Sequence, residues 1–219
     1  MSIKMRKLSL IKPITQEGLV EFNEKIGAIQ QQLSGGTNIG ITRRQAILKE
    51  LNLERNQTVV DIGCGGGHLV EEIGLCIGSC GKVFGVDTSQ FQINSAIEKC
   101  KNLSNVEFLC CNANAISIDD RSCDAVTFTQ TLEYIENVDE VLTEAKRLQK
   151  SNSKFVNIST LWDYFGFHGP EKKLNDMMHD SYRGQKNPMI PTQLNGKLAM
   201  QGYKNIRAQD ISFFLTNKD

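Results

Sequence analysis

The sequence predicts an α/β fold, a doubly wound and mainly parallel sheet with helices on both of its faces. Short apolar runs alternate along the chain with helical patterns of three-and-four spacing, which is typical of strand–helix–strand units. A glycine cluster at residues 63–67 stands directly between the first of these strands and the helix that follows. Ligands of such sheets bind at the carboxyl ends of the strands, so this cluster indicates a binding site.

Composition and charge narrow the class of protein. The chain has 219 residues, enough for one domain with a small appendage. It carries 25 basic and 25 acidic residues, and this balance argues against a nucleic-acid partner. No apolar run approaches the roughly 18 residues that span a bilayer, so we expect no membrane partner.

The cysteines indicate the compartment. There are seven, none in the spacing of a zinc site, so we expect no metal and a reducing, cytoplasmic location. The basic, acid-free start, which runs as far as Glu17, is interpreted as a solvated arm, with an organelle-targeting segment as the alternative.

The N-terminal part, residues 1–40, is predicted to be an arm followed by a helix. Residues 1–13 form the arm, and apolar spacing predicts a helix from Thr15 to about Leu33, which Gly35 and Gly36 end. This helix could act as a lid, or it could simply pack against the body. A second short helix is expected from Thr42 to Leu51, because Thr42 and Gln45 have capping-box spacing.

The remaining residues, 41–219, form the predicted sheet domain. The expected strands are 58–62, 82–87, 105–111, 123–129 and 154–159. Helices are expected through Leu69 and Ile73, from Ser89, and after an Asn137 cap. A further helix should begin at Pro191 and end at Gly202, followed by a last strand at about Asn205–Leu215.

The chemistry-bearing segment lies at the end of the first strand. Gly63, Gly65 and Gly67 form a G-x-G-x-G frame, which lets the backbone turn tightly and touch a ligand. The frame does not fit the dinucleotide pattern G-x-G-x-x-G, because residue 68 is histidine and residue 70 is valine. Asp87 ends the second strand 24 residues after Gly63, where an acid can bind both ribose hydroxyls of a nucleoside.

These segments resemble the class I S-adenosylmethionine-dependent methyltransferases over about residues 40–215. VVDIGCGGGH resembles the first family motif and GKVFGVDTS the second, while NVEFLCCNANAI resembles the segment that lines the adenine. DAVTFTQTLEYIENVDEVLTEAKRLQK resembles the fourth motif with its helix. Trp162-Asp163 after the fifth strand is similar to the small-molecule methyltransferase branch.

The resemblance implies a Rossmann-like methyltransferase fold, S-adenosyl-L-methionine as cofactor, S-adenosyl-L-homocysteine as product and no metal. The implied cofactor contacts run from the methionine to the adenine. Asp61 and Gly63 would hold the methionine amino group, Gly65 and Gly67 would allow close approach, Asp87 would bind the ribose with Thr88 beside it, Asn112 and Ala113 would border the adenine, and Gln130 would lie by the methionine.

The chain departs from the family pattern at four places. Asn112 replaces a frequent Asp, Tyr134 replaces a common His, and Ser151–Ser153 replaces a Pro-Gly-Gly turn. The family sheet usually ends in an antiparallel hairpin, whereas this chain has sequence for one such strand, so the final hairpin could be incomplete.

The predicted function is methyl transfer to a small-molecule acceptor by in-line displacement. His168, Tyr134 and Asp163 are the candidate general bases, with Glu133 beside them. Residues 161–187, rich in aromatic residues and methionine, would cover the acceptor side, although ordinary packing explains them equally well. The alternatives are a non-catalytic scaffold that binds the cofactor or a protein, and a nicotinamide-dependent oxidoreductase, which the glycine spacing disfavours.

Overall fold

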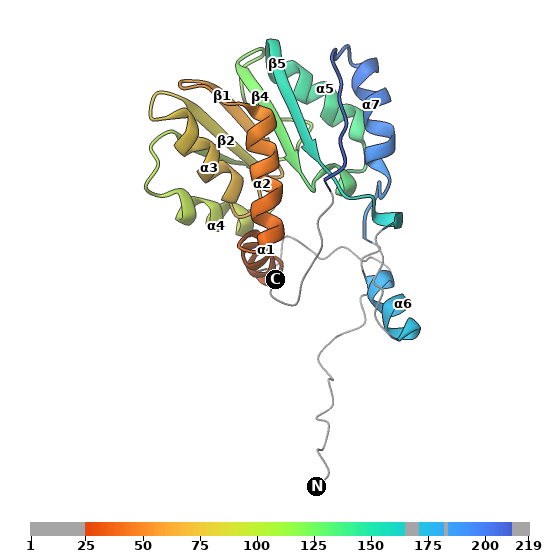
Figure 1. Ribbon diagram of the computed structural model, residues 1–219. Helices are drawn as coiled ribbons and strands as arrows, with labels where there is room; N and C mark the ends of the chain where they lie inside the picture. Colours follow the sequence, from red (N-terminus) through yellow and green to blue (C-terminus); the bar gives the residue numbers. More distant parts are fainter. Residues whose placement is uncertain (1–24, 165–170, 182–183, 212–219) are drawn as a thin grey trace.

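The core is a five-stranded parallel sheet of order β3-β2-β1-β4-β5. The computed structural model describes residues 25–164, 171–181 and 184–211. The strands are β1 (Thr58–Ile62), β2 (Lys82–Asp87), β3 (Val106–Cys110), β4 (Cys123–Thr129) and β5 (Gln149–Ile158). The predicted doubly wound fold is therefore confirmed, and the strand order changes direction between β1 and β4 (Figure 1).

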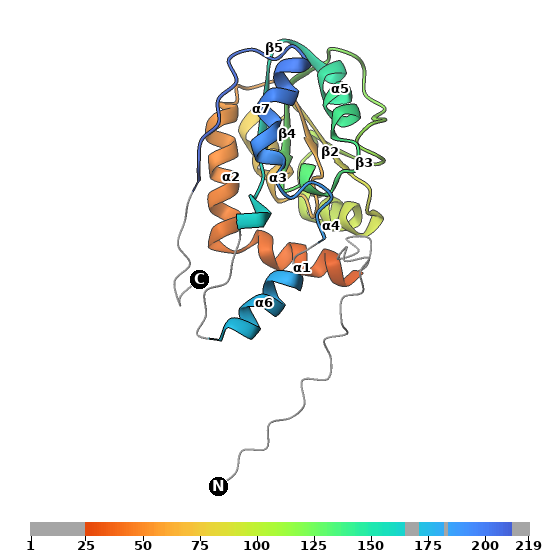
Figure 2. The same cartoon turned by 90° about the vertical axis from the view of Figure 1, so that its right-hand side faces the viewer.

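Helices cover both faces of this sheet (Figures 1 and 2). They are α1 (Lys25–Gly35), α2 (Asn38–Leu51), α3 (His68–Ile77), α4 (Gln90–Cys100), α5 (Val138–Leu148), α6 (Lys172–Ser181) and α7 (Ile190–Met200), with 3₁₀ turns η1 (Leu132–Tyr134) and η2 (Trp162–Tyr164). One apolar cluster joins α2, α3 and α4 to the sheet, and a second joins α5 and α7 to the opposite face. Burial of these two clusters supplies the main driving force for folding.

Side-chain caps fix where the helices begin. Ser89 accepts a hydrogen bond from the backbone N–H of Gln92, and Asn137, the predicted cap, accepts one from the N–H of Glu140. The second helix begins earlier than expected, at Asn38, because Thr37 caps it through the N–H of Gly40. The expected first helix is present from residue 25, and its earlier part lies outside the described residues, as do residues 1–24 as a whole.

The prediction of a last strand at Asn205–Leu215 is wrong for residues 205–211, which are irregular, while 212–215 lie outside the described residues. Side-chain contacts hold this tail instead of a backbone ladder. The hydroxyl of Tyr203 donates to Gln149, and Arg207 pairs with Glu50 at 3.0 Å. Residues 204–210 are mostly polar or charged, a composition depleted in strands. Among the described residues the sheet therefore ends at β5 without a hairpin.

The segment after β5 does not lie flat on the sheet. Its helix, α6, stands beyond the carboxyl ends of the strands, apart from the sheet body (Figure 1). Leu174 and Met177 on α6 are 51% and 61% exposed. The role of residues 161–187 as an acceptor-side cover thus remains a prediction.

Candidate functional site

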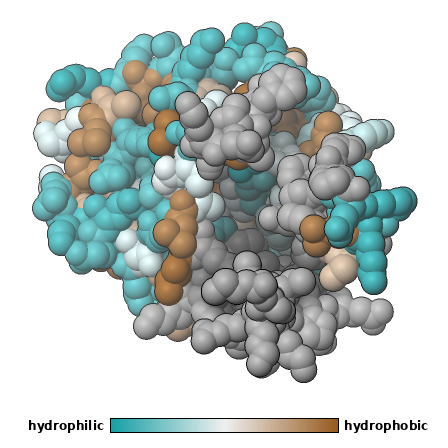
Figure 3. All heavy atoms as spheres, turned by 60° about the horizontal axis from the view of Figure 1, so that its bottom comes forward, coloured by the Kyte–Doolittle hydropathy of each residue, from teal (hydrophilic) through white to brown (hydrophobic). Residues whose placement is uncertain are grey.

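A cleft with a volume of about 2900 Å³ opens at the carboxyl ends of β1, β2, β4 and β5. Figure 3 views the molecule toward this end and shows a hollow there. The cleft begins at the glycine loop, passes the end of β4 and continues along the free edge of β5 to α7. Small-molecule sites usually occupy about 300–1,000 Å³, so this cleft has room for more than one ligand.

The glycine loop turns the chain between β1 and α3. The backbone N–H groups of Gly63 and Cys64 both donate to the carbonyl of Val86, at 2.7 and 2.9 Å, which ties the loop to β2. Gly65 and Gly67 have φ values of +51° and +79°, a region that favours glycine. A Cβ on Gly67 would lie 2.8 Å from the Cβ of Ala96, so glycine also lets α4 approach the loop.

Asp61 lies beneath this loop, one residue before the end of β1. Its side chain is 1% exposed, and its Oδ1 has no hydrogen-bond partner within the described part of the chain. Burial, together with the neighbouring charge of Asp87, raises the pKa of this carboxyl to about 8. A cation bound beside Asp61 would lower its pKa again, so this carboxyl is suited to an ammonium ligand.

Asp87 occupies the neighbouring position at the end of β2. Its Oδ2 accepts from the N–H of Gly65 at 2.9 Å and its Oδ1 accepts from the N–H of Ser89 at 2.9 Å. Burial raises the pKa of this carboxyl, while these backbone hydrogen bonds oppose the rise. Each carboxylate oxygen can accept a further hydrogen bond, so Asp87 can still bind hydroxyl groups.

The remaining predicted cofactor residues also line the cleft. Thr88 and Asn112 are exposed and Ala113 is half-buried. Gln130 follows β4 with a φ of +53°, and its Oε1 accepts from the hydroxyl of Thr160 at 2.9 Å. The Nε2 of Gln130 is buried and bonds to no described residue, so it remains available as a donor.

Of the three candidate bases, the structure describes two, Tyr134 and Asp163. Tyr134 lies in η1 and lines the cleft. Asp163 is exposed on η2 and is not among the lining residues, and His168 lies outside the described residues. Glu133 is fully buried and its Oε1 accepts from the N–H of Thr160 at 2.9 Å, which braces the ends of β4 and β5.

Sequence reasoning missed the contact between α1 and the glycine loop. Gln32 donates from Nε2 to the carbonyl of Gly66 at 3.0 Å, and the Oε1 of Gln31 lies 2.9 Å from the point where a Cβ on Gly65 would stand. His68 packs its ring against Gly35. Burial, aided by Lys99 and Arg44, lowers the pKa of His68 to about 4, so its ring is neutral at pH 7.

A family model described as a methyltransferase domain matches residues 53–206. The chain belongs to this family. It is a class I S-adenosylmethionine-dependent methyltransferase, as its sequence motifs predict. The matched residues begin after α2, so α1 and α2 lie outside the family match.

Several known proteins are similar to this methyltransferase. The UbiE ubiquinone/menaquinone biosynthesis C-methyltransferase of Escherichia coli is 25% identical over 173 residues, covering 70% of this chain and 69% of UbiE. The geranyl diphosphate C-methyltransferase of Streptomyces coelicolor, solved with S-adenosyl-L-homocysteine, has a TM-score of 0.59 at 19% identity, covering 73% of this chain and 56% of that one.

A Haemonchus contortus phosphoethanolamine N-methyltransferase, solved with S-adenosyl-L-methionine, has a TM-score of 0.68 at 19% identity, covering 85% of this chain and 43% of that one. The methyltransferase spans 40% of the length of one curated relative, from Streptomyces fradiae. Because both solved structures are only 19% identical to this chain, their similarity shows the fold alone.

The residues present in the cleft fit S-adenosylmethionine. The unpaired carboxyl oxygen of Asp61 suits the ammonium of its methionine, and the carboxylate of Asp87 can accept from its ribose hydroxyls. The glycine frame does not fit a dinucleotide, because the third glycine of the pattern G-x-G-x-x-G would stand at residue 68, which is histidine. No group of three or more potential metal ligands occurs in the described ranges, and no described helix is long and apolar enough to cross a membrane.

Proposed function

We propose that this methyltransferase transfers a methyl group from S-adenosyl-L-methionine to a small-molecule acceptor by in-line displacement and releases S-adenosyl-L-homocysteine. The observation that carries this proposal is the pairing of Asp61, buried with a free acceptor oxygen, and Asp87, which binds Gly65, in one cleft. Together they offer a site for an ammonium and a site for hydroxyl groups, which S-adenosylmethionine carries at its methionine and ribose.

The chain would bind the cofactor along the glycine loop. Asp61 accepts from the methionine amino group and becomes ionised in doing so, because a cation lowers its raised pKa. Asp87 accepts from the ribose, Thr88, Asn112 and Ala113 border the adenine, and the Nε2 of Gln130 donates toward the methionine. When bound, the cofactor supplies a methyl group activated by its sulfonium.

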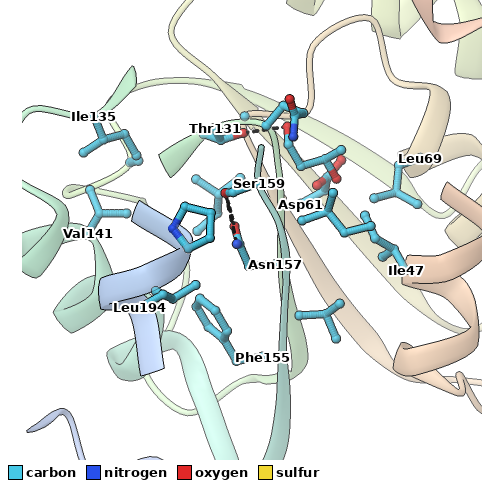
Figure 4. Close-up of a pocket in the computed structure, with 18 of the residues that line it drawn as sticks. Ile47, Asp61, Leu69, Thr131, Ile135, Val141, Phe155, Asn157, Ser159 and Leu194 are labelled. Carbon is cyan, nitrogen blue, oxygen red and sulfur yellow. Dashed lines mark hydrogen bonds between the residues drawn. The ribbon is translucent and has the colours of Figure 1, made fainter. Parts of the chain in front are cut away.

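The acceptor would occupy the part of the cleft near the ends of β4 and β5. Figure 4 shows Asp61, Ile47 and Leu69 on one side of β5, and Ile135, Val141, Phe155 and Leu194 on the other. Of the apolar residues named, Ile135 and Phe155 are only partly buried, so an acceptor on that side of β5 would meet some apolar surface. By their names, two of the similar proteins act in quinone biosynthesis and on geranyl diphosphate, which supports a small molecule.

The protein's main contribution to catalysis would be alignment. Holding a nucleophile in line with the methyl group can supply about 7–11 kcal/mol of the barrier reduction. If the acceptor atom carries a proton, that proton passes to a base as the new bond to the methyl carbon forms. Tyr134 lines the cleft and is the base that we favour, with Asp163 and His168 as the other candidates.

We further propose that the N-terminal part up to residue 40 is a lid over the cofactor. The bond from Gln32 to Gly66 and the approach of Gln31 to Gly65 place α1 against the glycine loop. The lid would shield the reacting groups from water while the methyl group is transferred.

The test is transfer of a labelled methyl group from S-adenosylmethionine to a panel of small acceptors with hydroxyl, amine, thiol and acidic carbon groups. We expect labelled product with at least one class and release of S-adenosylhomocysteine. Binding of the cofactor without turnover on any acceptor would favour the scaffold alternative. Binding of NAD without S-adenosylhomocysteine would overturn the proposal.

A further inference from the structure

Two helices at the mouth of the cleft each expose a pair of apolar side chains. On α1 these are Ile29 and Leu33, whose spacing of four residues places them on one side of the helix. On α6 they are Leu174 and Met177, at a spacing of three residues. Single exposed apolar residues are ordinary on a protein surface, whereas apolar strips along helices mark contact surfaces.

A third pair lies at η2, at the same end of the molecule. The N–H of Tyr164 donates to the carbonyl of Leu161 at 3.0 Å, and both side chains are exposed, Tyr164 at 78%. Figure 1 places α1 on one side of the mouth and η2 and α6 on the other, and Figure 3 shows apolar atoms beside the hollow. These six side chains, the rim residues, are more than half of the large apolar side chains that the described part of the chain exposes.

The sequence supplies positive charge next to this rim. The first 16 residues contain Lys4, Arg6, Lys7 and Lys12 and no acid, and the chain leads from this basic arm into α1. Three acids follow within residues 17–24, so the positive charge is confined to the arm. α6 carries two lysines and two aspartates and adds no net charge of its own.

We propose that the rim residues and the basic arm form a docking surface for a bilayer that contains anionic phospholipids. Apolar side chains enter the boundary between headgroups and acyl chains, and anionic headgroups attract the cations of the arm. Reversible attachment of a peripheral protein becomes stable when two such signals act together. Tyr164 adds a ring of the kind that lies at headgroup level.

A contact of this kind needs no spanning helix. The inference therefore replaces the expectation of no membrane partner, which rested on the lack of an apolar run long enough to cross a bilayer. Docking would turn the mouth of the cleft toward the lipid. It concerns the outer surface of the protein and does not depend on the proposed methyl transfer.

The first test is flotation of the full chain with two kinds of vesicle, phosphatidylcholine alone and phosphatidylcholine with about one fifth phosphatidylserine. We expect binding to the anionic vesicles to be stronger by at least about tenfold and to weaken in high salt, because mobile ions screen the attraction. No flotation with the anionic vesicles at low salt would overturn the proposal. Equal binding to both kinds would overturn the part played by the arm.

The second test removes one apolar side chain from each side of the mouth. Leu33→Ser combined with Met177→Ser should weaken binding to the anionic vesicles about tenfold or more, because two apolar side chains no longer leave water. Leu75→Ser with Met200→Ser is the matched control, since these residues are 66% and 89% exposed near the carboxyl ends of α3 and α7, away from the mouth. Equal losses in the two double variants would contradict docking through the rim.

The third test concerns the arm. Arg6→Gln combined with Lys7→Gln should weaken binding to the anionic vesicles by about fivefold for each cation removed and leave binding to phosphatidylcholine unchanged. Lys49→Gln with Lys101→Gln makes the same change in net charge at exposed positions of α2 and after α4. If this control loses as much affinity, net charge rather than the arm is responsible and the proposal is wrong.

A second copy of the chain is the other occupant that the rim would fit. Ultracentrifugation would then show a dimer that Leu33→Ser with Met177→Ser dissociates, the vesicles would remain unbound, and the docking proposal would be overturned. All of these variants should bind S-adenosylhomocysteine as the native protein does. Failure of the native protein to bind that ligand would overturn the proposed function alone.

Discussion

Asp61 couples cofactor binding to pH. Its folded pKa of about 8 lies above the ordinary value of 3.8, so in the ligand-free protein the carboxyl binds a proton more tightly when folded. The stability that Asp61 contributes is therefore fully present below about pH 4 and is lost as the pH rises toward 8. An ammonium ligand favours the ionised form and reverses this loss.

We accordingly predict that the affinity for S-adenosylhomocysteine rises between pH 6 and pH 8, by up to about tenfold per unit, with release of a proton. Calorimetric titrations in two buffers of different ionisation enthalpy measure that proton directly. In Asp61→Asn the affinity should be lower and independent of pH over this range. Equal heats in both buffers for the native protein would contradict the role of Asp61.

Asp87 is predicted to supply the hydrogen bonds to the ribose. Asp87→Ala should weaken binding of S-adenosylhomocysteine by about 10- to 150-fold, the range for a hydrogen bond to a charged group. Asp87→Asn keeps an acceptor oxygen for the N–H of Gly65 and should lose less. Calorimetry measures both variants, and an affinity for Asp87→Ala equal to that of the native protein would refute the ribose contact.

Candidate site residues could be predicted from the sequence where the strand order alone brings them together. Asp61, Asp87 and Gln130 end or follow neighbouring parallel strands, so their convergence follows from the strand order. The contact of Gln32 with Gly66 could not be found this way. It depends on how α1 crosses the glycine loop, which does not follow from local spacing.

At the scale of elements, the contact of α1 with the glycine loop predicts slow release of the cofactor. Gln32→Ala removes the hydrogen bond to Gly66, and we expect S-adenosylhomocysteine to dissociate about 2- to 10-fold faster in stopped-flow measurements. Leu33→Ala on the same helix is the control, because Leu33 is 71% exposed. Equal dissociation rates for Gln32→Ala and the native protein would reduce α1 to a packing element.

Most elements could be predicted because their signals are local. The Asn137 cap, the helix that starts near Ser89 and the buried apolar strands need no tertiary information. β5 begins at Gln149 rather than at residue 154, because its polar first residues extend the strand and Gln149 pairs with Cys123 of β4. The register between the two strands shifts between Cys123 and Ala125. The tail after Gly202 was predicted as a strand, yet the side-chain contacts of Tyr203 and Arg207 determine its path.

At the scale of the whole molecule, ligand binding should raise the stability of the folded state. A cofactor that binds the folded state alone adds about 2.7 kcal/mol at a concentration of 100 times its Kd. For a chain of this length that corresponds to a rise in melting temperature of about 5–10 °C. Thermal unfolding with S-adenosylhomocysteine should show this rise, and NAD at the same concentration should not.

The most direct test of the account is a crystal structure of the full chain with S-adenosylhomocysteine. We predict that the ligand lies along residues 63–67, with its amino group on Asp61 and its ribose hydroxyls on Asp87. A ligand bound elsewhere, or an Asp87 side chain turned away from the ribose, would contradict it.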